Sequence, residues 1–229
     1  MLRMSNSVFG NLLPKLRQHL QRNGVKGTVL RIINYARQRA YLDETHVWYE
    51  LTLGTARPRR ELPSGFVLLR GTPEHLPLLE QLPTVLEAEA RSRMEAGADL
   101  WLVLENQTAA FACWIFHSST PVLAAPNGRL KLPPEIVCLE DSVTSAAYRG
   151  RSIAPAAWSR IADDLETTEI RSIITKIEES NIASRRAVSK VGFQEIATMH
   201  FRRVGPSRRT TVKAGSGMAA DWLVEHLQR

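Results

Sequence analysis

The sequence predicts a mixed α/β fold of the α+β class, in which one sheet is flanked by helices and a helical extension precedes it. Two observations carry this prediction. From about residue 65, strand-like and helix-like segments follow in the order β-α-α-β-β-β-α-β-α-β-β, and a final helix ends the chain. Hydrophobic residues make up 44% of the 229 residues, which is enough for a full core. We therefore expect one main domain, residues 65–229, after an extension of residues 1–60.

The extension is strongly basic and amphipathic. Residues 1–60 contain 11 Lys and Arg against 3 Asp and Glu, whereas the remainder contains 19 against 20. Residues 1–40 predict two amphipathic helices, because leucines recur at helical spacing from Leu12 to Leu20 and apolar residues do so again from Val29 to Ala36. Helices this short need a surface to pack against.

Three kinds of surface suit such helices. They are the main domain or a second copy of the chain in a homodimer, a membrane surface or acidic partner protein, and nucleic acid. The nearly neutral main domain predicts no nucleic-acid groove, so we expect no nucleic acid as a partner there.

Composition indicates a cytoplasmic protein without a metal site. No run reaches the roughly 18 apolar residues that a spanning helix needs, and the first ten residues lack the apolar region of a signal peptide. Cys113 and Cys138 lie in apolar, strand-like runs, which favours two buried thiols over a disulfide. The six histidines show no metal-ligand spacing.

The individual elements follow from periodicity and from turn residues. Residues 46–53 alternate like a strand and residues 55–64 resemble a linker. In the main domain we expect strands at 66–69, 100–105, 109–117, 136–143, 171–177, 196–203 and 210–213, a loop at 118–132, and helices at 72–82, 85–96, 153–165, 181–191 and 219–227. The short polar loop between 105 and 109 predicts an antiparallel hairpin.

A loop of small residues and cations follows the strand at 136–143. It reads Arg149-Gly150-Arg151-Ser152-Ile153-Ala154 and leads directly into a helix. Small residues let a backbone approach a pyrophosphate, and free N–H groups at a helix start bind anions. An ordinary helix start capped by Ser152 would give the same pattern, so the loop alone leaves both interpretations open.

A second motif lies about thirty residues further on. Asn181 begins a helix, Ser184 stands three residues later, and the helix ends in Lys190-Val191-Gly192-Phe193. Together, Arg149-x-x-Ser152-x-Ala154 and this second motif resemble the GNAT superfamily of acyl-CoA-dependent N-acetyltransferases over residues 65–203. From the residues alone, Asn181 could instead serve only as a helix cap.

The resemblance implies a mostly antiparallel sheet in which two central strands separate after Val143. It implies that acetyl-CoA, or another acyl-coenzyme A, binds in the cleft between them. The pantetheine arm would follow the strand edge at Val143 and Thr144. The expected pyrophosphate contacts are Arg149, Gly150, Arg151, Ser152, Ile153 and Ala154, and Asn181 and Ser184 would line the cleft from the other side.

Two positions depart from the family pattern. Ser152 stands where the family has glycine. Val188 stands where it often has a tyrosine that protonates the departing thiolate, and valine has no proton to give. A thiolate is a fairly stable leaving group, so such an acid accelerates the reaction without being essential.

The acceptor amine needs a base, and carboxylates at strand ends are the candidates. Glu140 and Asp141 come first, although neighbours in a strand face opposite sides and only one would then face the cleft. Glu105 is the third candidate and His117 the fourth. Each could instead be a solvated group at the end of a strand.

The resulting hypothesis is direct transfer of an acetyl or other short acyl group to an amine in a ternary complex. The cleft motifs contain no cysteine that would indicate a covalent acyl-enzyme. The acceptor would be a small-molecule or sugar amine. The alternative is a protein that binds acyl-CoA as a scaffold with little or no turnover, which the residues Ser152 and Val188 favour.

Overall fold

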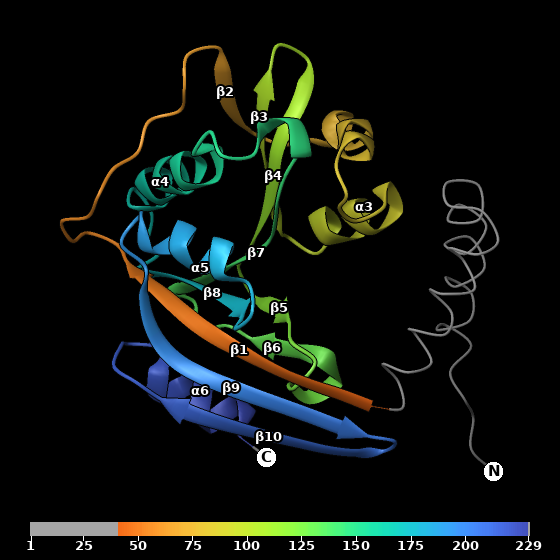
Figure 1. Ribbon diagram of the computed structural model, residues 1–229, viewed down its shortest axis with the longest axis vertical. Coiled ribbons are helices and arrows are strands. Elements are labelled where there is room, and N and C mark those ends of the chain that lie inside the picture. Colours follow the sequence, from red (N-terminus) through yellow and green to blue (C-terminus); the bar gives the residue numbers. More distant parts are fainter. Residues whose placement is uncertain (1–40, 229) are drawn as a thin grey trace. The chain divides into compact units, whose positions relative to one another are not determined.

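An eight-stranded sheet forms the centre of the protein in the computed structural model, which describes residues 41–228 (Figure 1). Its strand order is β10-β9-β1-β8-β7-β4-β3-β2. The strands are β1 (Tyr41–Thr52), β2 (Phe66–Arg70), β3 (Asp99–Glu105), β4 (Thr108–Phe116), β7 (Ile136–Thr144), β8 (Ser172–Glu178), β9 (Gln194–Val204) and β10 (Ser207–Ala214). The predicted α+β class is confirmed.

The parallel pairing of β7 with β8 is the feature that matters for the site. β2–β3, β3–β4, β4–β7 and β1–β8 all pair antiparallel, and the predicted hairpin at 100–117 is β3–β4. The β7–β8 ladder joins only Ile136 to Ser172, Val137 to Ile173 and Cys138 to Ile174. Helix α4 (Ile153–Leu165) supplies the crossover that parallel strands require.

Strand β1 corrects the expected boundary between the extension and the main domain. It lies inside the sheet, between β9 and β8, and pairs with β8 from His46–Glu178 to Thr52–Ser172. Val47, Tyr49 and Leu51 belong to the main hydrophobic core. The linker near residue 60 is therefore a connection within the domain, because the strand before it completes the sheet.

Helices cover both faces of the sheet. α4 and α5 (Ile182–Ser189) pack on one face, where Trp158, Ile161 and Val188 join the core. On the other face Arg93 of α3 (Glu87–Glu95) lies over the rings of Trp114 and Phe116. The remaining helices are η1 (Pro73–Gln81), η2 (Pro126–Gly128), η3 (Ala146–Tyr148) and α6 (Ala220–Leu227).

Two predicted segments differ in detail. The helix expected at 72–82 is a 3₁₀ helix, η1, with Pro77 inside it. Proline has no N–H to donate to the fourth preceding carbonyl, which disfavours the α form. The expected loop at 118–132 contains a hairpin of β5 (Ser119–Pro121) and β6 (Arg129–Lys131) around η2. The two cysteines are buried free thiols, as predicted.

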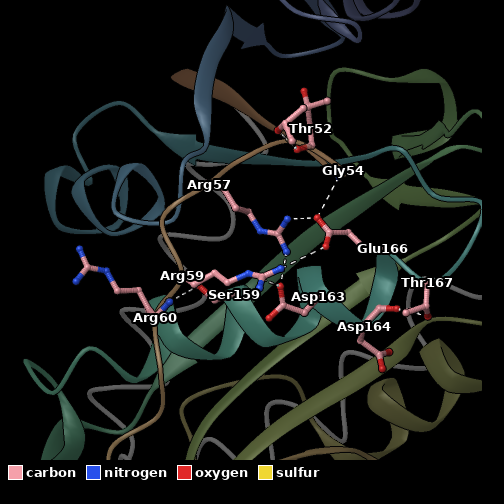
Figure 2. A network of polar contacts seen from close by, with 11 residues as sticks. Thr52, Gly54, Arg57, Arg59, Arg60, Ser159, Asp163, Asp164, Glu166 and Thr167 are labelled. Carbon is pink, nitrogen blue, oxygen red and sulfur yellow. Dashed lines mark hydrogen bonds and ion pairs between the residues drawn. The ribbon is translucent and has the colours of Figure 1, made fainter.

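An ion-pair cluster fastens the linker to the C-terminal half of α4 (Figure 2). The Arg57 side chain is only 3% exposed and donates to Glu166 and, at 2.5 Å, to Asp163 Oδ1. The N–H of Gly54 also donates to Glu166, and Arg59 reaches the same two carboxylates from the surface. The cluster thus fixes α4 to the linker.

The chain divides into two compact units, of which the larger, Glu44–His200 with Thr210–Arg229, contains β2, β3, β4, β7, β8, α4 and α5. In the described part of the smaller unit, Tyr41 donates to Asp43, and Arg202 lies 3.9 Å from the same carboxylate. The two helices expected at 1–40, with their membrane, partner and homodimer contacts, fall outside the described residues. No helix among the described residues could span a membrane.

Candidate active site

A cleft of about 770 Å³ opens where β7 and β8 separate. Their ladder ends at Cys138 and Ile174, so the facing backbone edges beyond these residues have no partner strand. The sequence analysis placed this separation after Val143. In the structure the ladder ends earlier, at Cys138 and Ile174, so the expected point of separation is wrong.

A bulge in β7 brings two adjacent carboxylates into the cleft. The register with β4 shifts between the pairs Ala112–Val143 and Trp114–Glu140, and Asp141 has a φ of 49°. A bulge inserts an extra residue and interrupts the alternation of side chains. Glu140 and Asp141 both line the cleft, which corrects the expectation that only one of them could face it.

The start of α4 offers several backbone donors to the cleft. Gly150 has a φ of 81°, and the N–H groups of residues 151 to 154 have no acceptor among the described residues. Pro155, in the first turn, has no N–H, so the donors end there. Ile153 is buried at 2% exposure and anchors this first turn to the core. Free N–H groups together with the helix dipole suit an anion at this position.

Ser152 caps α4 in the left-handed conformation, with φ 59° and ψ 22°, and makes no side-chain capping bond. This conformation costs a residue with a Cβ roughly 1–2 kcal/mol, a cost that glycine avoids. Ser152→Gly should therefore raise the free energy of unfolding by up to about 1 kcal/mol, measured by chemical denaturation. Ser152→Ala keeps the Cβ and serves as the control. An equal gain in both variants would show that backbone strain is not the cause.

The second motif lines the cleft from α5. Asn181 Oδ1 accepts the N–H of Ser184 at 3.1 Å, which makes Asn181 the cap of α5, and both residues line the cleft. Gly192, at φ 100°, follows the end of this helix. Val188 also lines the cleft and is 1% exposed, so this wall presents a methyl surface where the family often has a tyrosine.

The two adjacent carboxylates differ in their surroundings. The Glu140 side chain is 12% exposed and lies 2.5 Å from Lys176 Nζ. Burial raises the pKa of Glu140, while the Lys176 charge opposes that rise. Asp141 is 45% exposed and accepts from Arg93 at 2.6 Å. Glu140 is thus the more buried of the two carboxylates.

Most of the predicted residues meet in the cleft, but three do not. Glu105 lies outside the cleft lining and accepts from Tyr148 Oη at 3.0 Å. Arg151 also lies outside it, 4.0 Å from Glu105 and over the Tyr148 ring. His117 pairs with Asp99 at 2.8 Å, outside the cleft. The predicted residues that line the cleft are Glu140, Asp141, Val143, Thr144, Arg149, Gly150, Ser152, Ile153, Ala154, Asn181 and Ser184.

Lys176 is a cleft residue that the sequence analysis missed. It stands on β8, whose sequence mixes three isoleucines with polar residues, and it lines the cleft with its neighbours Thr175 and Ile177. Nothing local in the sequence distinguishes this lysine from a solvated one. No group of three or more potential metal ligands occurs among residues 41–228.

Comparison with solved structures identifies the fold. A putative GNAT-family acetyltransferase from Novosphingobium aromaticivorans matches 77% of this chain and 69% of its own, at 14% identity and TM-score 0.50. A tandem GNAT protein from the clavulanic acid biosynthesis pathway matches 82% and 59%, at 14% identity and TM-score 0.54. A GNAT-family acetyltransferase from Colwellia psychrerythraea matches 76% and 60%, at 12% identity and TM-score 0.51.

The chain thus has the GNAT fold, which confirms the fold expected from its two motifs, and it spans about 60% of the length of two of these three structures. No protein-family model and no curated sequence matches it.

Proposed function

We propose that this protein transfers an acetyl or other short acyl group from acyl-CoA to an amine. The observation that carries the proposal is the cleft itself. Unpaired strand edges along β7 and β8 lead to free N–H groups at the start of α4. An extended amide chain could pair with the edges, and the N–H groups suit a pyrophosphate at its end.

The polar groups of the cleft are segregated in the way this reaction requires. Arg149 lies just before the start of α4, where phosphates would bind. Glu140, with a pKa raised by burial, lies near the point where the strands separate. The chain thereby offers a cationic binding end and a basic reacting end, and we propose Glu140 as the base that deprotonates the amine.

Val188 supports a second candidate function, an acyl-CoA-binding protein with little turnover. Its side chain cannot donate a proton from α5 to a departing thiolate. In that case the cleft would bind the cofactor as a ligand, and the protein would act through the complex. The acceptor class proposed for the enzyme is a small-molecule or sugar amine.

Two measurements separate these functions. Calorimetry with acetyl-CoA tests binding, with Ser152→Asp as the variant that places a negative charge at the expected phosphate position. We expect at least a ten-fold loss of affinity in Ser152→Asp and none in Ser152→Gly. Release of free thiol is then measured with amino sugars, polyamines and amino acids as acceptors. No binding at millimolar acetyl-CoA would reject both functions, whereas binding without thiol release would leave the scaffold protein.

A further inference from the structure

Lys176 is held at one position by contacts from three strands. Its ammonium lies 2.5 Å from Glu140 Oε1 on β7 and 3.0 Å from the carbonyl oxygen of Pro121 on β5. It also lies 5.9 Å from the ring centroid of Trp48 on β1. The side chains of Lys176 and Glu140 are only 15% and 12% exposed, so water does not replace these contacts.

This pair lies beside the point where β7 and β8 separate. The last rung of the β7–β8 ladder is Cys138–Ile174, and Glu140 and Lys176 each stand two residues beyond it. The anion-binding start of α4 follows the opposite end of β7. An extended cofactor with its phosphates at α4 therefore directs its thioester towards the Glu140–Lys176 pair.

Among the described residues that line the cleft, the other candidate proton donors are less suitable than Lys176. Val188 presents only methyl groups to the cleft, and Tyr148 donates its hydroxyl to Glu105. The other lysine of the lining, Lys190, caps the far end of α5. The Lys176 ammonium is therefore the proton donor that lies beside the expected position of the thioester.

We propose that Lys176 donates the proton to the departing thiolate of coenzyme A, and that Glu140 and Lys176 form a base–acid pair that resets itself. This inference rests on the proposed acyl transfer. It assigns the acid role to β8, whereas the family resemblance placed it on α5 at the position of Val188.

The proton balance closes within the pair. The neutral amine nitrogen attacks the thioester carbonyl carbon, so an N–C bond forms and the C–S bond breaks. Glu140 takes the proton from the amine nitrogen, and Lys176 gives a proton to the sulfur. The protonated Glu140 then returns its proton to the neutral Lys176 across their hydrogen bond. The products are the amide and the free thiol, and the pair is as it began.

The electrostatic coupling between Glu140 and Lys176 makes Lys176 a stronger acid at the step in which it donates its proton. Burial is the largest influence on the pKa of Lys176 and lowers it, but the Glu140 carboxylate and smaller neighbouring influences outweigh burial and raise the pKa overall. When Glu140 takes the amine proton, the main attraction disappears and burial remains. Lys176 then becomes a stronger acid at the step that needs one.

The other titratable groups around Lys176 do not replace the attraction between Lys176 and Glu140. His46 on β1 has a pKa lowered by burial and then by the Lys176 charge, so it stays neutral. The thiol of Cys138 on β7 has a pKa raised by burial and stays protonated. The carboxylate of Asp141 is engaged by Arg93.

Titration of bound coenzyme A tests the placement without any acceptor. The thiolate absorbs in the ultraviolet, so the pKa of the bound thiol can be followed directly. A lysine beside the sulfur lowers a thiol pKa. We expect Lys176→Met to raise the bound thiol pKa by at least about one unit, a ten-fold loss of thiolate. Lys176→Arg should leave it unchanged, as should Lys213→Met, which removes an exposed lysine outside the cleft lining.

Turnover and mass spectrometry test the chemistry. Lys176→Arg keeps the charge, but a guanidinium does not release a proton, so kcat with the best acceptor should fall about 100-fold at unchanged acetyl-CoA affinity. If Lys176→Met does not fold, Glu140→Gln/Lys176→Met replaces the pair by neutral groups of similar size for the thiol titration. Equal thiol pKa values in wild type and the methionine variant would overturn the proposal, as would full kcat in Lys176→Arg or acylation of Lys176 itself. Failure of wild type to bind coenzyme A would instead reject the proposed function.

Discussion

Replacing Arg57 with methionine should lower the free energy of unfolding by about 2–4 kcal/mol. Arg57 is 3% exposed and bonds both Asp163 and Glu166, so its loss leaves two carboxylates of α4 without their buried partner. Methionine keeps the apolar stem and isolates the lost charge. The cost falls at or below the usual range for a broken buried pair, because the two carboxylates are 33% and 23% exposed and can be hydrated. Urea denaturation measures the change.

Arg59→Met is the matched control for Arg57→Met. Arg59 reaches the same carboxylates, at 3.3 and 3.8 Å, but is 68% exposed, and such surface pairs contribute about 0–1 kcal/mol. Comparable losses in the two variants would mean that burial of Arg57 does not decide its contribution.

The loss of unfolding free energy caused by Arg57→Met should depend on pH. The pKa of Glu166 is lowered, chiefly by the hydrogen bond from Arg57 and then by that from the N–H of Gly54. A carboxyl group with a lowered pKa in the fold stabilises it above the unfolded pKa, and the contribution disappears as pH falls through the folded pKa. The difference between wild type and Arg57→Met should therefore be full at neutral pH and shrink below the ordinary Glu pKa of 4.5.

The order of elements after residue 65 could be predicted because most carry a local signal. Residues 100–117 form two apolar runs around a short polar turn, and Gly192 marks the end of α5. The membership of β1 in the sheet could not be predicted, because the linker that contains Arg57 separates β1 from the other strands in the sequence. The linker looks like a boundary by composition, and its contacts with residues about a hundred positions away, such as that of Arg57 with Asp163, show that it is fixed to the domain.

The two motifs that resemble the family's cofactor site are local in the sequence, whereas the contacts of the cleft carboxylates are not. The loop at 149–154 and the cap at Asn181 are local motifs, and both reach the cleft. The roles of Glu140 and Asp141 depend on a bulge opposite β4, which breaks the alternation assumed for a regular strand. The contact of Lys176 with Glu140 joins two strands across a parallel ladder, and no sequence spacing reports it.

Glu140→Gln should lower kcat for thiol release by about 10²–10⁴-fold while the affinity for acetyl-CoA changes little. The amide matches the carboxylate in size and still accepts a hydrogen bond from Lys176, but it cannot take a proton from the amine. Because burial raises the pKa of Glu140, the acidic limb of the wild-type kcat profile should lie above the ordinary Glu pKa of 4.5. Stopped-time thiol assays across pH, with the best acceptor from the amine panel, measure both effects.

Asp141→Asn separates the two cleft carboxylates. Asp141 is more exposed and already bound by Arg93, so we expect less than about a ten-fold loss of kcat and an unchanged acidic limb. Glu105→Gln should leave the profile intact, because Glu105 faces Tyr148 outside the cleft. A larger loss in Asp141→Asn than in Glu140→Gln would transfer the base to Asp141. In that case the burial of Glu140 beside Lys176 would position Lys176 as the proton donor and would not set the pKa of the base.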